Sequence, residues 1–300
     1  FQNLQYFDFS SNDIYKFPES VCEIPIIEIH FESNRICEDQ NPPCPIINWD
    51  EQILTQRCKN VGDIQFIEDL ISQNGLEYDY YNFGFQEWQE FDEEEMDRLT
   101  TINHLRGTHS NDTLTSIPLS ILNVNYLENI QFENHKIASI PNELFFLDSL
   151  KELNLSSNEI NILSESINAI NGILKLNLSQ NQLTSIPNEI GELESLIELD
   201  LSANEIDSLP NSIGNLTDLD ILNISDNSIL QIPENLENLI NLTTFDISGN
   251  ELDSLPSIWC DELQIEWDNP NQFNADDNKL CDDDKIPSCI LINVLNQNCD

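Results

Sequence analysis

The sequence predicts a solenoid of the α/β class, with a curved parallel sheet on the concave side, short helices or irregular segments on the convex side, and two tandem modules. Three observations support this prediction. Six consecutive segments of the 300-residue chain repeat one apolar template. Apolar and polar residues alternate within each segment, which is typical of a strand with one buried face. Eight cysteines fall into two matching sets of four.

The template has apolar residues at its first, fourth and sixth places and a polar residue, usually Asn, at its ninth. The six segments begin 23 residues apart, at Leu127, Leu150, Ile173, Leu196, Leu219 and Leu242. A constant period of this size indicates a solenoid in which each repeat forms one coil. Two further segments of this kind begin at Leu4 and Ile26, near the start of the chain.

The residues of one repeat predict its local structure. Leu153 and Leu155 alternate with polar neighbours, so a short strand buries one face. The Asn at the ninth place turns inward, where its amide satisfies backbone groups that would otherwise be buried without partners. We therefore expect an internal ladder of amides, formed by Asn158, Asn181, Asn204, Asn227 and Asn250.

The second half of each repeat predicts the convex side. In the repeat that follows Asn181, the apolar residues Ile186, Ile190 and Leu193 point inward. Pro187 fixes an extended entry and limits the helix after it to one or two turns.

These residues resemble the leucine-rich repeat superfamily, because five of the six segments keep every core position and the ninth-place Asn. The resemblance implies a solenoid fold and a role in interaction, and no chemistry. With its cysteine-bearing end caps, the chain resembles the secreted or surface tandem leucine-rich repeat proteins of bacteria, which are usually adhesive or recognition modules. It lacks the closely spaced Cys-x-Cys of animal extracellular end caps.

The two sets of cysteines lie in matching contexts. Cys22, Cys37, Cys44 and Cys58 correspond to Cys260, Cys281, Cys289 and Cys299. Without a CxxC pair and with little histidine, they favour disulfides in an oxidising, extracytoplasmic compartment over zinc. A strand between Cys260 and Cys281 places these two at opposite edges of the sheet, beyond the reach of a disulfide. The expected pairs are Cys281–Cys289 and Cys260–Cys299 and, by duplication, Cys37–Cys44 and Cys22–Cys58.

The duplication also predicts the domain organisation. Residues 1–60 are the end of a first module with its cap, 61–98 the N-terminal cap of a second, 99–258 its repeats and 259–300 its four-cysteine cap. Matched cysteines lie 238 to 245 residues apart, so a module has roughly 240 residues. We expect the chain to be part of a longer tandem protein with more repeats before Phe1, since an uncapped coil would expose its core.

The segment 61–98 predicts a capping helix followed by an edge strand. Apolar residues recur at helical spacing after Asp63, a suitable N-cap, and Gly75 is a helix stop. The aromatic residues that follow either pack beneath this helix or bind a ligand, and packing is the favoured interpretation: they are Tyr78, Tyr80, Tyr81, Phe83, Phe85 and Trp88. The acidic run 91–97 is expected to be a solvated loop, and Leu99, Ile102 and His104 to fill the core of the first coil.

The charge limits the partners. Asp and Glu number 55 against 11 Lys and Arg, a formal net charge of −44. This charge opposes binding to nucleic acids and anionic membranes and favours cations or basic partners. There is no apolar run long enough for membrane insertion.

The spacing of the candidate residues establishes no metal site, cofactor site or catalytic group. His104, His109 and His135 approach one another and fit either a metal site or buried structural roles, which we favour because zinc-ligand spacing is lacking. Calcium is a weaker alternative at an acidic stretch that includes Asn278 and lacks the EF-hand order: Asp276, Asp277, Asp282, Asp283 and Asp284. No nucleophile with its base stands out, so the chain is not expected to be an enzyme.

The predicted binding surface is the concave face, which is polar and acidic. We expect it to bind a protein or glycan as an adhesion or interaction module: Glu152, Asn154, Lys175, Asn177, Glu198, Asp200, Ile221, Asn223, Thr244 and Asp246. The alternative is a structural spacer or stalk, with acidic loops that bind calcium. Asn154, Asn177 and Asn223 are also N-glycosylation acceptor sequences, and sugars there would cover this face.

Overall fold

The computed structural model of the chain describes residues 6–8, 28–30, 58–59, 61–76, 85–91, 96–103, 113–257, 259–263, 265–290, 296–297 and 299. Two compact units make up the chain. One consists of Phe1–Gln65 with Glu87–Leu99, and the other of Phe66–Gln86 with Thr100–Asp300.

In the first unit, strands β1 (Tyr6–Asp8) and β2 (Glu28–His30) pair in parallel, with Phe7 opposite Ile29. These two residues hold the same place in the two early template segments, so the repeat register continues there. Strand β3 (Cys58–Lys59) pairs in parallel with the start of β5 (Met96–Asn103).

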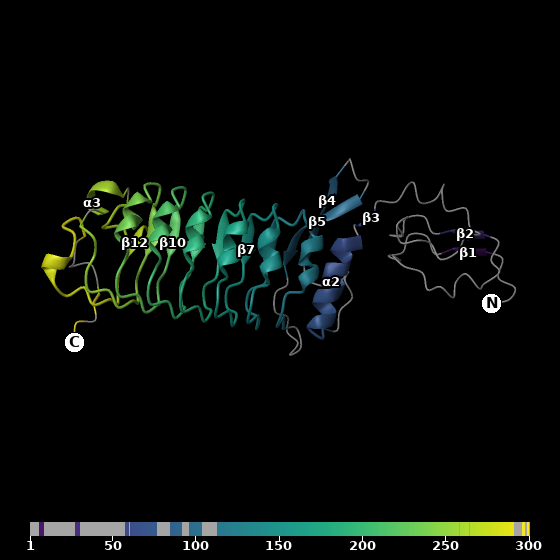
Figure 1. Ribbon diagram of the computed structural model, residues 1–300, viewed down its shortest axis with the longest axis horizontal. Coiled ribbons are helices and arrows are strands. Elements are labelled where there is room, and N and C mark those ends of the chain that lie inside the picture. Colours follow the sequence, from purple (N-terminus) through teal and green to yellow (C-terminus); the bar gives the residue numbers. More distant parts are fainter. Residues whose placement is uncertain are drawn as a thin grey trace. The chain divides into compact units, whose positions relative to one another are not determined.

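The second unit is a solenoid of stacked coils (Figure 1). Every strand pairs in parallel with the next, in the register that the template predicts: Leu153 lies opposite Leu176, and Leu176 opposite Leu199. The strands after β5 are β6 (Asn129–Gln131), β7 (Glu152–Asn154), β8 (Lys175–Asn177), β9 (Glu198–Asp200), β10 (Ile221–Asn223), β11 (Thr244–Asp246) and β12 (Phe273–Asn274). The predicted parallel sheet is confirmed.

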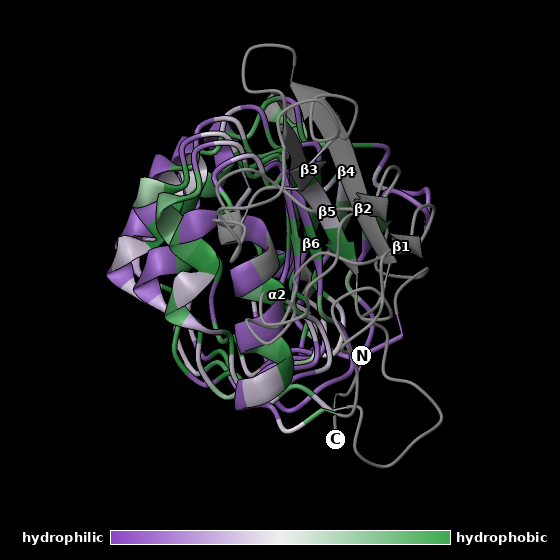
Figure 2. Cartoon of the chain, turned by 90° about the vertical axis from the view of Figure 1, so that its right-hand side faces the viewer, coloured by the Kyte–Doolittle hydropathy of each residue, from purple (hydrophilic) through white to green (hydrophobic). Residues whose placement is uncertain are grey.

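A short 3-10 helix lies on the other side of each coil, as the proline-led segments predict. Pro187 has φ −67° and ψ 154° and precedes the helix extended, while Ile190 and Leu193 are at most 1% exposed. The helices are η3 (Leu119–Asn123), η4 (Asn142–Phe146), η5 (Glu165–Ala169), η6 (Asn188–Glu192), η7 (Asn211–Asn215) and η8 (Glu234–Asn238). Figure 2 shows hydrophobic and hydrophilic positions alternating along these helices, as expected for helices with one buried face.

The core is a continuous apolar stack. The side chains at the first, fourth and sixth places of the six template segments are at most 2% exposed, from Leu127 to Ile247. Burial of each such side chain contributes roughly 1.5–3 kcal/mol to stability. Because each coil covers the next, this stabilisation passes from neighbour to neighbour along the array.

The predicted amide ladder is confirmed. The Nδ2 of Asn181 donates to the carbonyl oxygens of Leu155, Leu178 and Ser179 at 3.0–3.1 Å, and its Oδ1 accepts from the N–H of Ile160 at 3.0 Å. The other four asparagines make the same four bonds in their own coils. Each rung therefore joins its own strand to the preceding coil.

Asn278 is a further rung that the sequence analysis placed in the acidic stretch. It is fully buried, it donates to the carbonyl oxygen of Ile247 at 3.0 Å, and it accepts from the N–H of Leu252 at 3.1 Å. Its coil does not fit the 23-residue period, because the connection from the preceding segment, which begins at Leu242, is longer and includes helix α3 (Trp259–Glu262). The coil was therefore not predicted as a repeat. Asn278 is therefore a structural residue.

The capping helix is confirmed as α2 (Val61–Gln73), and it ends at Gly75, whose φ is +63°. The prediction that Asp63 is its N-cap is wrong. Asp63 lies in the first turn, fully buried, and its Oδ2 accepts from the N–H of Leu99 at 2.8 Å. The Asp63 carboxylate, which was expected to cap the helix, thus accepts a hydrogen bond from a buried N–H of strand β5.

The segment between α2 and the first coil is partly described. Strand β4 (Phe85–Phe91) pairs with β5, which agrees with an edge strand over Phe85 and Trp88. The ends of the acidic run 91–97 belong to strands and not to a loop, because Phe91 ends β4 and Met96 begins β5; residues 92–95 lie outside the described residues. Tyr78, Tyr80, Tyr81, Phe83, His104 and His109 lie outside the described residues.

The predicted pairing of the late cysteines is wrong. The disulfides are Cys260–Cys289 and Cys281–Cys299, with Cα–Cα distances of 5.6 and 5.8 Å. After Cys281 the chain passes through η9 (Asp283–Lys285), where the N–H of Leu255 donates to the carbonyl oxygen of Lys285 at 3.0 Å.

The chain therefore crosses from Cys281 to the side of Cys260 within eight residues, because Cys289 is bonded to Cys260. It then returns, because Cys299 is bonded to Cys281. The predicted pairs Cys281–Cys289 and Cys260–Cys299 required this crossing to come after Cys289. The separation of Cys260 from Cys281 by a strand was predicted correctly. The expected pairs Cys37–Cys44 and Cys22–Cys58 stay predictions, because Cys22, Cys37 and Cys44 lie outside the described residues.

Candidate binding surface

The solvent side of strands β6 to β11, here called the sheet face, carries all ten predicted partner-binding residues. Successive strands add one residue each to three columns, spaced by the roughly 4.8 Å between neighbouring strands. The first column is Asn129, Glu152, Lys175, Glu198, Ile221 and Thr244, and the second is Gln131, Asn154, Asn177, Asp200, Asn223 and Asp246. Lys175 is exposed, and the rest of these two columns are half-buried.

The second column is held rigidly by turns at the strand ends. The Oδ1 of Asp200 accepts from both the N–H and the Oγ–H of Ser202, at 3.0 and 2.6 Å. Asn177, Asn223 and Asp246 accept the same two bonds from the serine two residues later. The Asn and Ser residues of this face therefore have a structural role, and these turn bonds use only the Oδ1 of each second-column residue.

The half of the sheet face nearer the N-terminus is a network of side chains bonded to one another. Gln131 donates to Asn129 at 2.7 Å, and Asn129 donates to Glu152 at 2.8 Å. Asn154 donates to Glu133 at 3.1 Å. These bonds engage carboxylates of the face and leave fewer of them for a partner.

Lys175 stands between two carboxylates of the first column. Its Nζ lies 2.8 Å from Oε1 of Glu198. The hydrogen bond to Glu198 and the charges of Glu198 and Glu152 raise the pKa of Lys175. The lysine is thus engaged by its own column, and the charge of this column is partly balanced.

The half nearer the C-terminus carries a second-column row that includes two carboxylates. Asp200, Asn223 and Asp246 alternate carboxylate and amide on neighbouring strands. Asn274 of β12 extends the column and donates to Oδ2 of Asp246 at 3.3 Å. This row can accept and donate hydrogen bonds at a regular spacing, which is the chemistry of binding to an extended, positively charged chain.

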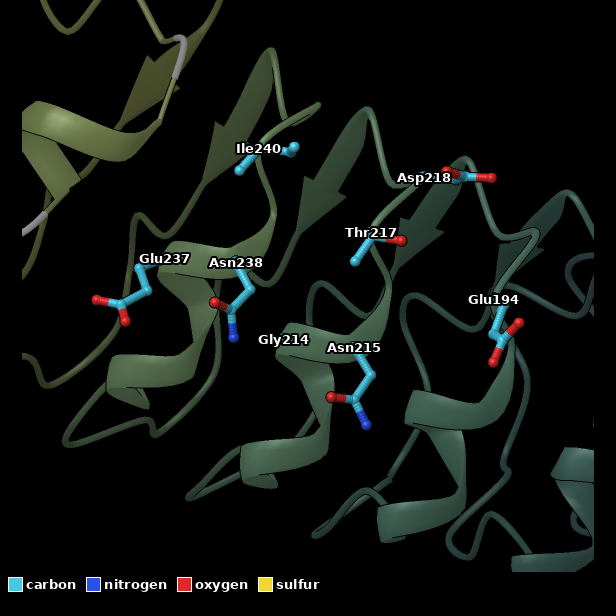
Figure 3. Close-up of a pocket in the computed structure, with 8 residues that line it drawn as sticks. All are labelled: Glu194, Gly214, Asn215, Thr217, Asp218, Glu237, Asn238 and Ile240. Atoms are coloured by element: carbon cyan, nitrogen blue, oxygen red, sulfur yellow. The ribbon is translucent and has the colours of Figure 1, made fainter.

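A depression that the sequence analysis missed lies on the helical side of the coils (Figure 3). Its volume is about 880 Å³. Its lining comes from three successive coils: Glu194, Gly214, Asn215, Thr217, Asp218, Glu237, Asn238 and Ile240. The 23-residue register could have found it, because Glu194, Thr217 and Ile240 form one column. Figure 3 shows these side chains spread along the coils without converging on one point.

The predicted metal candidates take other roles where they are described. His135 is 5% exposed, and its Nδ1 accepts from the N–H of Leu114 at 3.3 Å, the bond that ladder asparagines make. Asp276 accepts from the N–H of Asn296 at 2.9 Å, and Asp282 from the N–H of Asp284 at 3.2 Å. Within the described ranges, no three His, Cys, Asp or Glu side chains are grouped to hold a metal.

The comparisons with known proteins agree with this geometry. Models of the leucine-rich repeat match residues 171–229, 149–170 and 241–262. The coils within residues 149–229 and 241–262 are therefore leucine-rich repeats. No curated protein matches the chain in sequence.

Several solved structures share the fold. The leucine-rich repeat ectodomain of the Arabidopsis thaliana receptor kinase GASSHO1/SCHENGEN3, in complex with CASPARIAN STRIP INTEGRITY FACTOR 2, is 22% identical with a TM-score of 0.54. A leucine-rich repeat protein of Leptospira interrogans is 20% identical with a TM-score of 0.50, and the plant peptide hormone receptor RGFR1, in complex with RGF2, is 18% identical with a TM-score of 0.50.

The lengths of these proteins differ from that of the chain. The alignments cover 93%, 98% and 91% of this chain and 28%, 76% and 39% of those three chains, in the same order. The chain thus spans between about a quarter and three quarters of the length of these structures. In the described part of the chain, no helix is long and apolar enough to cross a bilayer.

Proposed function

We propose that this chain is a non-catalytic, extracytoplasmic module that binds an extended segment of a protein partner on the C-terminal half of its sheet face. The observation that carries the proposal is the row Asp200, Asn223, Asp246, whose half-buried side chains are fixed by the serine turns on neighbouring strands. A row of oriented groups on a rigid sheet binds without first losing conformational freedom.

The charge of the molecule indicates the chemistry of the partner. A formal net charge of −44 attracts a basic segment and raises its rate of association. The two described disulfides support an oxidising compartment. Two receptors of the same fold are in complex with CASPARIAN STRIP INTEGRITY FACTOR 2 and with RGF2, which shows that such arrays can hold protein ligands.

The test uses linear 12-residue peptides selected by phage display against the oxidised chain. The sheet-face variant combines Asp200→Asn, Asp246→Asn and Glu198→Gln. Asparagine occupies the same column in neighbouring coils, so the turns to Ser202 and Ser248 remain. The matched control variant combines Glu205→Gln, Asp207→Asn and Glu234→Gln, which removes the same charge from exposed residues outside the sheet face.

Selected peptides are expected to be basic, and titration calorimetry is expected to show at least tenfold weaker binding to the sheet-face variant and an unchanged dissociation constant for the control. Equal losses in both variants would indicate attraction by net charge alone. A loss confined to the control variant, or selection of peptides without basic residues, would exclude this face. A spacer tolerates both sets of substitutions and enriches no peptide above background.

A further inference from the structure

The last coil of the array is covered by the C-terminal tail, of which the structure describes Asn296, Gln297 and Cys299. The N–H of Asp277 donates to the carbonyl oxygen of Asn296 at 2.6 Å. In the coils before it, the N–H groups of Asp226 and Gly249 donate in the same way to the following coil, at Ser248 and Asp276. Asn296 therefore occupies the place of a residue in a coil that would come next.

Gln297 makes the hydrogen bonds of a ladder asparagine. Its Oε1 accepts from the N–H of Leu280 at 3.2 Å, and its Nε2 donates to the carbonyl oxygen of Ala275 at 2.9 Å. Asn278 makes the equivalent bonds one coil earlier, to the N–H of Leu252 and the carbonyl oxygen of Ile247. Gln297 is thus the final rung of the ladder, supplied by a tail and reached with one more methylene group than asparagine has.

The tail is tied to the array by one disulfide. Cys299 lies two residues after Gln297 and is bonded to Cys281, which directly follows Leu280. Both cysteines of this bond are exposed, whereas Cys260 and Cys289 are half-buried, and the N–H of Cys289 donates to Sγ of Cys260 at 3.2 Å. An exposed disulfide is the more accessible to an attacking thiolate.

We infer that Asn296, Gln297 and Cys299 form a redox-releasable cap on the edge of strand β12, a property separate from the proposed binding function. A dithiol reductant attacks one sulfur of Cys281–Cys299 and forms a mixed disulfide. Its second thiolate then resolves that bond, so the protein leaves with two thiols and the reductant as a disulfide. Without the bond, Asn296 and Gln297 keep their hydrogen bonds to the segment from Ala275 to Leu280 but lose the covalent link, and the last coil after β12 opens.

The effect has an expected size. Closing a loop of this length with a disulfide changes the opening equilibrium by a factor on the order of 100. Once open, the amides of Asp277 and Leu280 exchange with solvent. The amides of Asp226 and Ile229 make the same two kinds of bond inside the array, at 2.8 and 3.0 Å, and serve as an internal reference.

The experiment titrates the whole chain with dithiothreitol and follows single amides by NMR hydrogen exchange, while alkylation and peptide mapping identify the reduced bond. Cys281–Cys299 is expected to be reduced first, with exchange at Asp277 and Leu280 at least tenfold faster and no change at Asp226 and Ile229. Reduction of Cys260–Cys289 first, or unchanged protection of Leu280 after reduction of Cys281–Cys299, would overturn the inference.

A substitution separates the rung from the disulfide. In the oxidised protein, Gln297→Ala is expected to accelerate exchange at Leu280 and to leave Asp277 protected, because the carbonyl oxygen of Asn296 remains. Gln297→Glu keeps an acceptor for Leu280 and loses the donor to Ala275, so its effect on Leu280 should be smaller. Equal exchange at Leu280 in the wild type and Gln297→Ala would show that the glutamine is not a rung.

Discussion

The carboxylate of Asp63, in the first turn of the capping helix, accepts a hydrogen bond from the backbone N–H of Leu99, the first core residue of the array. The donor and acceptor lie 2.8 Å apart and are 36 residues apart in sequence. Both residues are fully buried. The helix is thereby attached to strand β5 by a charge-assisted bond, which is stronger than one between neutral groups.

Removing this carboxylate should loosen the N-terminal cap. Asp63→Ala leaves the N–H of Leu99 without this acceptor in a buried site, at a cost of about 1–3 kcal/mol. Asp63→Asn keeps an acceptor oxygen and should cost less. Urea unfolding followed by circular dichroism measures both variants. If alanine and asparagine were equally destabilising, the charge and not the acceptor would be the source of the effect.

The amide ladder should be more sensitive than any exposed asparagine. Asn204→Ala removes the acceptor of the Leu183 N–H and the donor to Leu178, Leu201 and Ser202. Each buried group left unpaired costs about 1–3 kcal/mol. Asn211→Ala, at an exposed position that begins η7, is the matched control and should change stability by less than about 0.5 kcal/mol. Thermal unfolding of both variants checks this, and similar values would contradict a structural ladder.

Two glycines allow the 3-10 helices to approach closely. A Cβ at Gly214 would overlap the carbonyl oxygen of Asn235 in the next coil, and a Cβ at Gly191 would overlap that of Ser212. Gly214→Ala should therefore destabilise the array by about 1–3 kcal/mol through overpacking. Gly172→Ala meets only the flexible end of Lys151, at 3.1 Å, and should be tolerated. Denaturant midpoints compare the two, and a tolerated Gly214→Ala would mean that neighbouring coils can move apart.

The ion pair of Lys175 predicts a dependence on alkaline pH. Its raised pKa means that the pair stabilises the folded state fully below the unfolded pKa of about 10.4 and loses this contribution as pH rises through the folded pKa. The pair is exposed, so its contribution is about 0.5 kcal/mol or less. NMR titration of Lys175 should show a lower pKa in Glu198→Gln. An unchanged pKa there would assign the shift to Glu152 and not to the hydrogen bond.

The matched cysteine contexts predict the bonds of the early cap. Cys22 corresponds to Cys260, Cys37 to Cys281, Cys44 to Cys289 and Cys58 to Cys299. The observed late pairs therefore predict Cys22–Cys44 and Cys37–Cys58. Digestion at acidic residues without reduction suits this chain, since Glu38 and Asp39 separate Cys37 from Cys44. A peptide that joins Cys37 to Cys44 would show that the two caps differ.

Periodicity explains which features could be predicted. The strands, the buried template positions and the five asparagines recur with one period, so each copy supports the assignment of the others. The sequence also separated Cys260 from Cys281 correctly, because a strand between them has a definite length.

The remaining features depend on single contacts that have no period. Asp63 was expected at the helix end, since no pattern shows that the N–H of Leu99 lacks a partner elsewhere. The crossing of the chain between Cys281 and Cys289 is not encoded by spacing, because eight residues can run locally or across the edge. On the sheet face, the columns were predicted, whereas the turns that fix Asn177 and Asp200 follow from side-chain geometry.

The ladder has a consequence for how such an array changes in length. Each asparagine, such as Asn181, reaches back 26 residues to one carbonyl oxygen, and it accepts from an N–H 21 residues before it. Both distances span one coil boundary, so an insertion of a few residues near that boundary misplaces a rung. Gain or loss of a whole 23-residue unit by recombination restores every bond. Variation in array length among relatives is therefore expected in whole coils, each of which adds one row to the sheet face.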